Sequence, residues 1–331
     1  MRRNAARDLR SRRQLNRAGW RVMVIWECRK IPRVWGHFAR RLRRSWKRMS
    51  TGTQGRNDAR KQSCDLWRCQ EGACTLSAID LTVTSPPYYR HRDYGVQGQL
   101  GMEATVDDYV ANIRPVLTEL FRVTAKTGTC FLVIGDTYAH QKLLLVPHRI
   151  ALAADAIGWT VRNDLIWNKL DPPPESPRNR WRSGHEHILF LTKERGKYKF
   201  HADAIRVPYA EATVKRWGNG QVYGGPKSAE RKNQRDSRMR HGRSFALHPN
   251  GCLPTDVWSL PAGDSSARHY ATFPDRLVKL IILACSDAGD LVLDPFAGSG
   301  TTCRLAKETG RRFIGIELNP DYAEMAAKAV K

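Results

Sequence analysis

The sequence predicts an α/β fold built on a doubly wound, mostly parallel sheet of the Rossmann-like type. Short apolar strands alternate with segments of helical spacing over 76–193, and the same alternation returns over 258–331. In the second stretch one strand runs into a glycine-rich turn that opens a helix. Alternation of this kind is typical of a parallel sheet that is covered by helices.

The individual elements follow in chain order from local patterns. We expect strands where short apolar runs are bounded by turn residues, and helices where apolar residues recur every three or four positions. The first strand stops before Pro86, because proline offers no backbone N–H to a sheet. The expected strands cover 79–84, 129–134, 160–167, 187–191, 291–293 and 313–316, and the expected helices cover 106–124, 146–156 and 273–285.

Composition indicates an intracellular protein. A chain of 331 residues with 41% hydrophobic residues can bury one large core. It has no apolar run near the ~20 residues that span a membrane. The basic N-terminus holds only the short apolar run 22–26, so we expect no secretion signal and no membrane partner. The expected location is the bacterial cytoplasm, in association with the nucleoid.

The eight cysteines predict free thiols and no metal site. They form no Cys-x-x-Cys pair, and the evenly spaced Cys64, Cys69 and Cys74 lack the close pairing of zinc knuckles. Free thiols suit a reducing cytoplasm.

A formal net charge of +24 favours a polyanionic partner, with nucleic acid as the first candidate. A solvated basic tail is the alternative, since charge alone says nothing about chemistry. The excess of positive charge is located mainly in two regions, a basic N-terminal extension over 1–60 and a polar, glycine-rich stretch over 194–257.

A glycine-rich turn predicts a cofactor that contains adenosine. The turn and its flanks hold Asp294, Phe296, Gly298, Gly300 and Thr301. Glycine lets the backbone approach a ligand closely, and Glu317, after the next strand, can accept both hydroxyls of a ribose. An ordinary strand–helix turn is the alternative. Cys303 stands where a dinucleotide-binding turn has its third glycine, and the lysine of a P-loop is missing, so a pyrophosphate ligand is disfavoured.

The segment Ser85-Pro86-Pro87-Tyr88 follows the first expected strand and predicts chemistry on an amino group. The amino nitrogen of cytosine is a poor nucleophile, because its lone pair is delocalised into the ring. Two acceptors aimed at its hydrogens, the Ser85 hydroxyl and the Pro86 carbonyl, would draw it toward sp3 geometry. The prolines stiffen the loop, and Tyr88 can stack on the base. A polar turn that ends a strand is the alternative.

Together the two motifs predict methyl transfer. In a parallel sheet both would lie at the carboxyl ends of neighbouring strands, near the switch point of the sheet. Residues 76–193 would then form the catalytic half of the domain, and 258–331 the cofactor-binding half. A methyl group on a sulfonium is already activated, so the enzyme has only to align it with the amino nitrogen for in-line transfer. This is a proximity effect that needs no metal.

Over about 76–331 the chain resembles the beta class of bacterial DNA amino-methyltransferases. In that class the catalytic tetrapeptide precedes the cofactor loop, as 85–88 precedes 296–300 here. Further matching segments are 128–136, 157–169, 185–191, 257–258 and 269–274.

The resemblance implies S-adenosylmethionine as cofactor, double-stranded DNA as substrate and the methyltransferase form of the Rossmann-like fold. In that class a catalytic tetrapeptide of the form Ser-Pro-Pro-Tyr usually accompanies methylation of N4 of cytosine. A tetrapeptide that begins with Asp usually accompanies methylation of N6 of adenine. Cytosine-C5 enzymes use a cysteine that follows proline, and none of the eight cysteines here does. The residues that the resemblance assigns to the cofactor are Phe273, Pro274, Phe296, Gly298, Gly300 and Glu317, the last of them on the ribose.

Residues 194–257 predict an inserted, basic target-recognition region. Enzymes that modify a base inside a duplex flip it into a pocket, and basic side chains then contact phosphates and base edges. A flexible solvated insertion is the alternative. The basic residues expected to contact DNA are Arg206, Lys215, Arg216, Arg231, Lys232, Arg235, Arg238, Arg240 and Arg243.

The N-terminal residues 4–28 resemble the tail of very short patch repair endonucleases. The likeness lies in a helical segment, then 19–22 (Gly-Trp-Arg-Val) and a strand that ends at 26–28 (Trp-Glu-Cys). The upstream catalytic acid and zinc ligands of that family are absent, so we expect a remnant without nuclease activity. Residues 40–48 could form a basic helix on DNA or membrane, with a partly disordered tail as the alternative.

The leading hypothesis is site-specific methylation of N4 on a flipped cytosine in double-stranded DNA. The alternatives are an N6-adenine enzyme on the same scaffold, an RNA substrate, and a DNA-binding remnant without catalysis, which the irregular segment 50–76 favours. We expect a monomer or a homodimer. A cognate restriction endonuclease that acts at the same site is the further partner considered.

Overall fold

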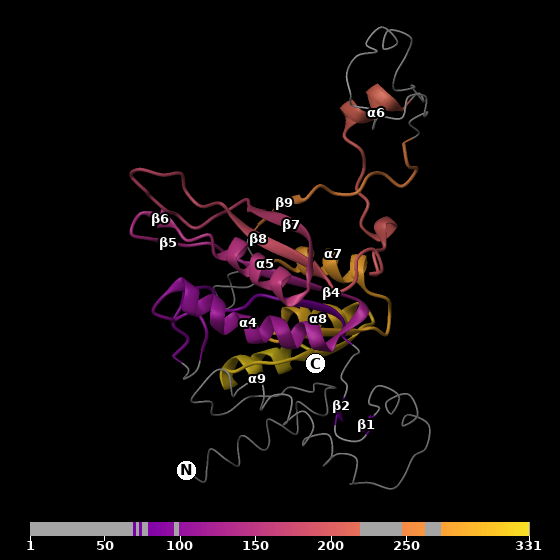
Figure 1. The fold of residues 1–331 in the computed structure, drawn as a ribbon. Helices are drawn as coiled ribbons and strands as arrows, with labels where there is room; N and C mark the ends of the chain where they lie inside the picture. Colours follow the sequence, from indigo (N-terminus) through magenta and orange to yellow (C-terminus); the bar gives the residue numbers. More distant parts are fainter. Residues whose placement is uncertain are drawn as a thin grey trace, which may run out of the picture. The chain divides into compact units, whose positions relative to one another are not determined.

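The computed structural model describes residues 69–70, 73–74, 79–95, 99–218, 247–261 and 273–330 (Figure 1). These fall into two compact units, the first formed by the described residues up to Phe200 with those from Asp256 onward, and the second by His201–Thr255. The expectations for the N-terminal extension 1–60, for the basic residues 231–243 and for the matching residues 269–272 lie outside the described residues.

The first unit is built on one seven-stranded sheet. Its strands, in spatial order, are β11 (Arg312–Gly315), β10 (Leu291–Asp294), β3 (Ile79–Thr84), β4 (Thr124–Ile134), β8 (His185–Thr192), β7 (Thr160–Lys169) and β9 (Val257–Leu260). All neighbouring pairs are parallel except the two that involve β8. The prediction of a mostly parallel sheet is therefore confirmed.

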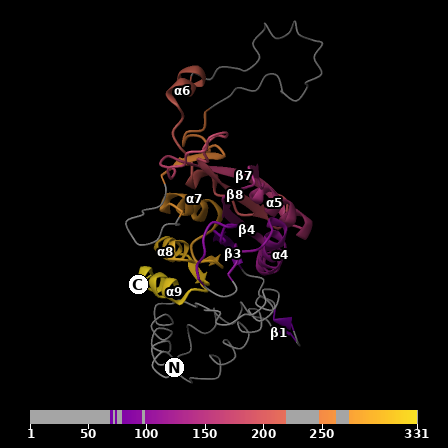
Figure 2. The same cartoon turned by 90° about the vertical axis from the view of Figure 1, so that its left-hand side faces the viewer.

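Helices cover both faces of this sheet. On one face α4 (Val106–Val123) and α5 (Val146–Ile157) pack on β4, β7 and β8, and on the other α7 (Asp275–Cys285) and α8 (Thr301–Glu308) pack on β3, β4 and β10. Figure 2 shows the sheet between these two groups, with α9 (Pro320–Ala329) beside α8. The chain thus winds outward from β3 and β10 in both directions, as a doubly wound fold requires.

The helix boundaries follow from local sequence. The side chain of Thr105 accepts a hydrogen bond from the backbone N–H of Asp108 and caps α4. Helix α5 ends at Gly158, whose φ of 115° only glycine adopts readily. Trp159 follows, is 1% exposed, and stands edge-on to Phe121 at a centroid distance of 5.2 Å. This contact ties the strand after α5 to the core under α4.

Several strands are longer than the sequence predicts. Strand β4 begins at Thr124 because the register against β3 shifts, so that Ile79 pairs with Thr124 and Leu81 with Thr129. Strands β7 and β8 continue toward their connecting loop until Asn168 pairs with His185. Three features have no counterpart among the predicted strands: β9, the pair β1 (Cys69–Gln70) and β2 (Ala73–Cys74), and the hairpin of β5 (Tyr138–Ala139) and β6 (Lys142–Leu143).

The second unit is small and polar. It contains a short helix, η1 (Ala202–Ala204), the helix α6 (Glu211–Trp217), and an isolated bridge between Val207 and Cys252. Within the described residues of both units, no helix combines the length and apolarity that crossing a membrane requires.

Candidate active site

The two predicted motifs leave the sheet side by side. Strands β3 and β10 are hydrogen-bonded neighbours, with Leu293 paired to Thr82, so both end at the same level. The Thr84 hydroxyl donates to Oδ1 of Asp294 across 2.7 Å and joins the last residues of the two strands. Ser85 follows one strand and the glycine turn follows the other. The predicted placement of both motifs at one edge of the sheet is confirmed.

The Ser85–Tyr88 loop carries a chain of hydrogen bonds that ends at Glu186. The Ser85 Oγ lies 3.2 Å from the Tyr88 hydroxyl, which lies 2.5 Å from Oε2 of Glu186 on β8. An ionised carboxylate only accepts, so the Tyr88 hydroxyl must donate to Glu186 and accept from Ser85. The single proton of Ser85 is therefore committed to Tyr88, which leaves the lone pairs of Oγ free to accept.

Other contacts hold this loop in place. The Tyr109 hydroxyl donates to the Pro87 carbonyl across 2.7 Å, and Lys169 of β7 forms an ion pair with Glu186. A side chain at Gly135 would come within 2.9 Å of the Tyr88 ring, so that glycine makes room for it. Burial and the nearby Glu186 carboxylate raise the pKa of Tyr88 well above its ordinary value. Tyr88 thus stays neutral and remains a donor.

The glycine turn approaches its surroundings more closely than other residues would permit. Gly298 and Gly300 have φ of 51° and 89°. A Cβ at Gly300 would lie 2.9 Å from the backbone of Ala326 on α9, whereas no atom lies within 4 Å of the Cβ position at Gly298. Gly300 therefore allows α9 to pack closely against the turn. Gly298 leaves open space over the turn, which fits a bound ligand.

Glu317 lies behind this turn. Its Oε2 accepts from the backbone N–H of Gly298 and its Oε1 from that of Asn319, both across 2.8 Å. Each carboxylate oxygen has a second lone pair, so both can still accept a ribose hydroxyl. Burial raises the pKa of Glu317, and the backbone N–H groups of Asn319, Gly298 and Leu318 oppose that rise. This pair of acceptors fits the adenosine cofactor that the sequence predicts.

The remaining residues assigned to the cofactor lie around the turn or at the start of a helix. Phe296 is half-buried and packs against the main core, and Thr301 begins α8. Pro274 caps α7, directly after Phe273. The start of α7 is held to α8, because Arg304 donates to Oδ2 of Asp275 across 2.6 Å.

Asp294 is 1% exposed and acts from beneath the turn. Its Oδ1 accepts from the Thr84 hydroxyl and, across 3.1 Å, from the backbone N–H of Phe296. It thereby fixes where the turn leaves β10. Burial raises the pKa of Asp294 to about 6, above its ordinary 3.8. The sequence groups Asp294 with the cofactor-binding residues, and its burial beneath the turn favours a supporting role there.

The raised pKa predicts a pH-dependent loss of stability. The folded protein binds the Asp294 carboxyl proton more tightly than the unfolded chain does. The stability that this proton contributes is therefore complete below pH 3.8 and is lost as pH rises through about 6. Asp294→Asn keeps the accepting oxygen without the charge. Between pH 4 and 7 the free energy of unfolding of the variant should therefore gain about 2 kcal/mol relative to the unmodified protein. Urea denaturation over this range measures it, and a constant difference would contradict the prediction.

The residues predicted to contact DNA fall partly outside the described chain. Arg231, Lys232, Arg235, Arg238, Arg240 and Arg243 are not among the described residues. Lys215 and Arg216 are exposed in the last turn of α6. Arg206 contacts its own unit, with Nε 2.6 Å from Oδ1 of Asp203 and Nη1 2.9 Å from the carbonyl of Gly251.

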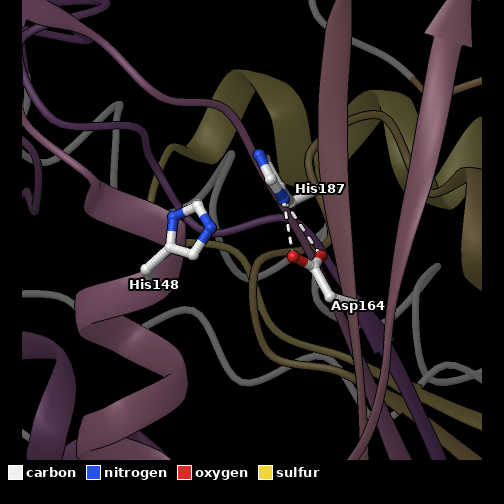
Figure 3. A group of neighbouring side chains, drawn as sticks. All are labelled: His148, Asp164 and His187. Carbon is white, nitrogen blue, oxygen red and sulfur yellow. Dashed lines mark hydrogen bonds and ion pairs between the residues drawn. The ribbon is translucent and has the colours of Figure 1, made fainter.

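One cluster in the described part of the chain could hold a metal ion. It consists of His148 on α5, Asp164 on β7 and His187 on β8, with ligand atoms within 4.8 Å of one another (Figure 3). Two imidazoles and one carboxylate suit a transition metal. However, His187 Nδ1 lies 3.0 Å from both Asp164 oxygens, and this hydrogen bond explains their approach without an ion. We assign the cluster to packing between α5 and the sheet.

Sequence reasoning gave no role to three residues near the two motifs. Glu186 and Lys169 fell within segments that matched the resembled class, but only the folded chain brings them to Tyr88. Burial raises the pKa of Tyr94, and the Glu317 carboxylate adds to this rise, which puts Tyr94 near Glu317. No local pattern marks these residues, because their partners are distant in sequence.

A family model described as DNA methylase (N6_N4_Mtase) matches residues 79–328. The chain belongs to this DNA methylase family. The match spans both motifs and the strands that carry them, so the predicted family is confirmed at the level of N6/N4 DNA methylases.

Named relatives resemble the methylase along most of their length. It is 32% identical over 281 residues to the type II methyltransferase M.SmaI of Serratia marcescens, covering 76% of this chain and 84% of that one. It is 30% identical over 283 residues to the type II methyltransferase M.Cfr9I of Citrobacter freundii, covering 77% and 82%.

A solved structure shares the fold of the methylase. The PvuII DNA methyltransferase, described as cytosine-N4-specific, superposes with a TM-score of 0.53 and 17% identity, covering 77% of this chain and 79% of that one.

Proposed function

We propose that the methylase transfers a methyl group from S-adenosylmethionine to N4 of a cytosine flipped out of double-stranded DNA. The observation that carries the proposal is the position of Ser85. Its hydroxyl stands at the sheet edge beside the glycine turn, with its proton committed to Tyr88 and its lone pairs free. A site that accepts hydrogens from an amino group, next to one that accepts a ribose, fits this reaction.

On the base side, Ser85 and the Pro86 carbonyl accept the two amino hydrogens and draw the nitrogen lone pair out of the ring. The negative charge of Glu186 polarises the Tyr88 hydroxyl, which makes Ser85 a better acceptor, because hydrogen bonds in a chain strengthen one another. One amino proton must leave after transfer. The chain from Ser85 through Tyr88 offers it a route to the Glu186 carboxylate.

On the donor side, Glu317 holds the ribose while the turn at Gly298 and Gly300 lies against the adenosine and methionine parts. Phe296, Phe273 and Pro274 help to enclose them. When bound, the sulfonium of S-adenosylmethionine supplies an already activated methyl group. The residues of the chain have only to align this group with the amino nitrogen, which is a proximity effect.

The second unit, His201–Thr255, is our proposed target-recognition region within 194–257. It carries Lys215 and Arg216 among the described residues, and further basic residues lie in the stretch 231–243. M.SmaI and M.Cfr9I are both named as type II methyltransferases. We propose by likeness that this methylase protects DNA from a restriction endonuclease that acts at the same site.

The identity of the methylated base tests the proposal. Plasmid DNA from a host that expresses the methylase should contain N4-methylcytosine when its nucleosides are separated by mass spectrometry. DNA from the same host without the gene is the control. N6-methyladenine in place of N4-methylcytosine would identify the adenine enzyme, whereas no methylated nucleoside would support the remnant without catalysis.

A further inference from the structure

We propose a second DNA-binding site on the first unit, formed by residues 138–145 and 170–184 and called the ridge below. In it, Trp181 contacts the bases, and Arg178 and Arg182 contact the phosphates beside the flipped nucleotide. This inference rests on DNA as the substrate in the proposed function. It concerns a surface that lies outside the predicted target-recognition region.

Exposed apolar side chains are concentrated in the ridge. The Trp181 side chain is 92% exposed, on a loop between two strands. Five of the eleven exposed large hydrophobic residues in the described part belong to the ridge, namely Tyr138, Leu143, Leu145, Leu170 and Trp181. Clustered apolar exposure of this kind marks an interaction site, and an exposed indole is suited to stacking on a base.

The loop that presents Trp181 is held in a defined shape. Glu175 forms an ion pair with Arg180 and accepts from the backbone N–H of Ser183 across 3.0 Å. The Arg180 guanidinium lies 4.0 Å from the ring centroid of Tyr138 on the neighbouring hairpin. Four prolines in the loop restrict its backbone further. Trp181 is therefore preorganised for binding, which lowers the entropy cost of contact.

The hairpin beneath the loop carries unusual backbone geometry. His140, Gln141 and Leu145 have φ of 50°, 61° and 56°, and they are three of the four non-glycine residues with positive φ in the described chain. His140 and Gln141 form the two-residue turn between β5 and β6, where positive φ at both positions is required. Asn179 donates to the Gln141 side chain across 3.2 Å and ties the loop to this turn. The positive φ of His140 and Gln141 thus follows from the turn, whereas that of Leu145, directly before α5, is a strained backbone position.

The charge of the ridge favours DNA over a protein surface. Arg178, Arg182 and Lys142 are exposed cations, against one exposed acid, Asp171, and the Glu175 carboxylate is paired with Arg180 within the loop. Exposed cations around an aromatic side chain match a nucleic acid, which offers phosphates and stacked bases at close spacing. A protein partner would better match a wider apolar face with few charges.

The position of the ridge connects it to the active site. The loop begins after Lys169 and ends before His185, so it is bracketed by the Lys169–Glu186 ion pair that holds Tyr88. The backbone N–H of Lys169 donates to the Gly184 carbonyl across 2.8 Å and closes the base of the loop. Figure 1 shows the loop and the β5–β6 hairpin extending together from the same side of the sheet. DNA whose base reaches Ser85 therefore passes close to the ridge.

The test measures duplex affinity as a function of salt. A fluorescent duplex cut from plasmid DNA is titrated by anisotropy with the full-length chain and with three variants: Trp181→Ala, Trp181→Phe and the double variant Arg178→Gln/Arg182→Gln. Trp181→Ala should weaken binding at least about 10-fold without changing the salt slope, because stacking releases no counterions. Trp181→Phe should restore most of the affinity. The double arginine variant should flatten the slope of log K against log salt by about 2.

Matched controls separate the ridge from general surface effects. Leu152→Ala removes an apolar side chain that is 71% exposed on α5, and Arg114→Gln removes an exposed cation on α4. Both should bind DNA like the unmodified chain. All variants should bind S-adenosylmethionine normally by calorimetry. Wild-type affinity and slope in the ridge variants would overturn the proposal, as would conversion of a dimer to a monomer by Trp181→Ala with DNA affinity retained.

The outcome is independent of the base that is methylated. If the methylase made N6-methyladenine, the proposed function would fail, while a loss of duplex affinity in the ridge variants would still support this DNA-binding site.

Discussion

Ser85→Ala is expected to lower the rate of methyl transfer by about 100- to 1,000-fold, because it removes an acceptor from the amino group as the transition state forms. The Pro86 carbonyl would remain, but it cannot hold both hydrogens. The Ser85 side chain forms its hydrogen bond to Tyr88, within the same loop, so the fold should tolerate its loss. Single-turnover transfer of a tritiated methyl group to plasmid DNA, at saturating S-adenosylmethionine, measures the effect.

Two further variants show whether the loss has the assigned cause. Tyr88→Phe breaks the link to Glu186 and leaves the Ser85 hydroxyl in place, so we expect a smaller loss of about 10-fold. Thr118→Ala removes a hydroxyl that bonds only to the Arg114 carbonyl of its own helix, and should transfer methyl normally. Equal incorporation by Ser85→Ala and the unmodified methylase would remove Ser85 from the reaction.

Glu317→Ala is expected to weaken S-adenosylmethionine binding by a factor on the order of 100, because it deletes charged acceptors of two ribose hydroxyls. It also frees the backbone N–H groups of Gly298 and Asn319, so the turn would lose its fixed shape. Glu317→Gln keeps one accepting oxygen, so its affinity for S-adenosylmethionine should fall between those of Glu317→Ala and the unmodified protein. Isothermal calorimetry with S-adenosylmethionine gives the affinities directly.

An exposed acid at the end of α8 controls for the loss of one negative charge. Glu308→Ala removes an exposed carboxylate that pairs with Arg304 on α8, and should leave the affinity unchanged. Thermal unfolding without ligand shows whether Glu317→Ala still folds. Unchanged affinity in a folded Glu317→Ala variant would place the cofactor away from this turn.

Sequence reasoning found the elements that local patterns specify. The core of β4 is a continuous apolar run, and α4 carries its own capping threonine, so both are visible without the fold. The register shift that lengthens β4 and the turn between β5 and β6 were not predicted. The first depends on pairing with β3, and the second has no glycine at the positions that take positive φ. Such features are decided by neighbours in space.

By itself, the sequence determined the class of fold, the Ser85–Tyr88 loop, the glycine turn and the acid that follows it, because each is a short segment next to its own strand. Only the tertiary structure brought Glu186 and Lys169 to Tyr88, buried Asp294 beneath the turn, and left Trp181 exposed on the loop between β7 and β8. The physical reason is that hydrogen bonds, burial and exposure depend on which distant segments pack together, and strand order sets that packing.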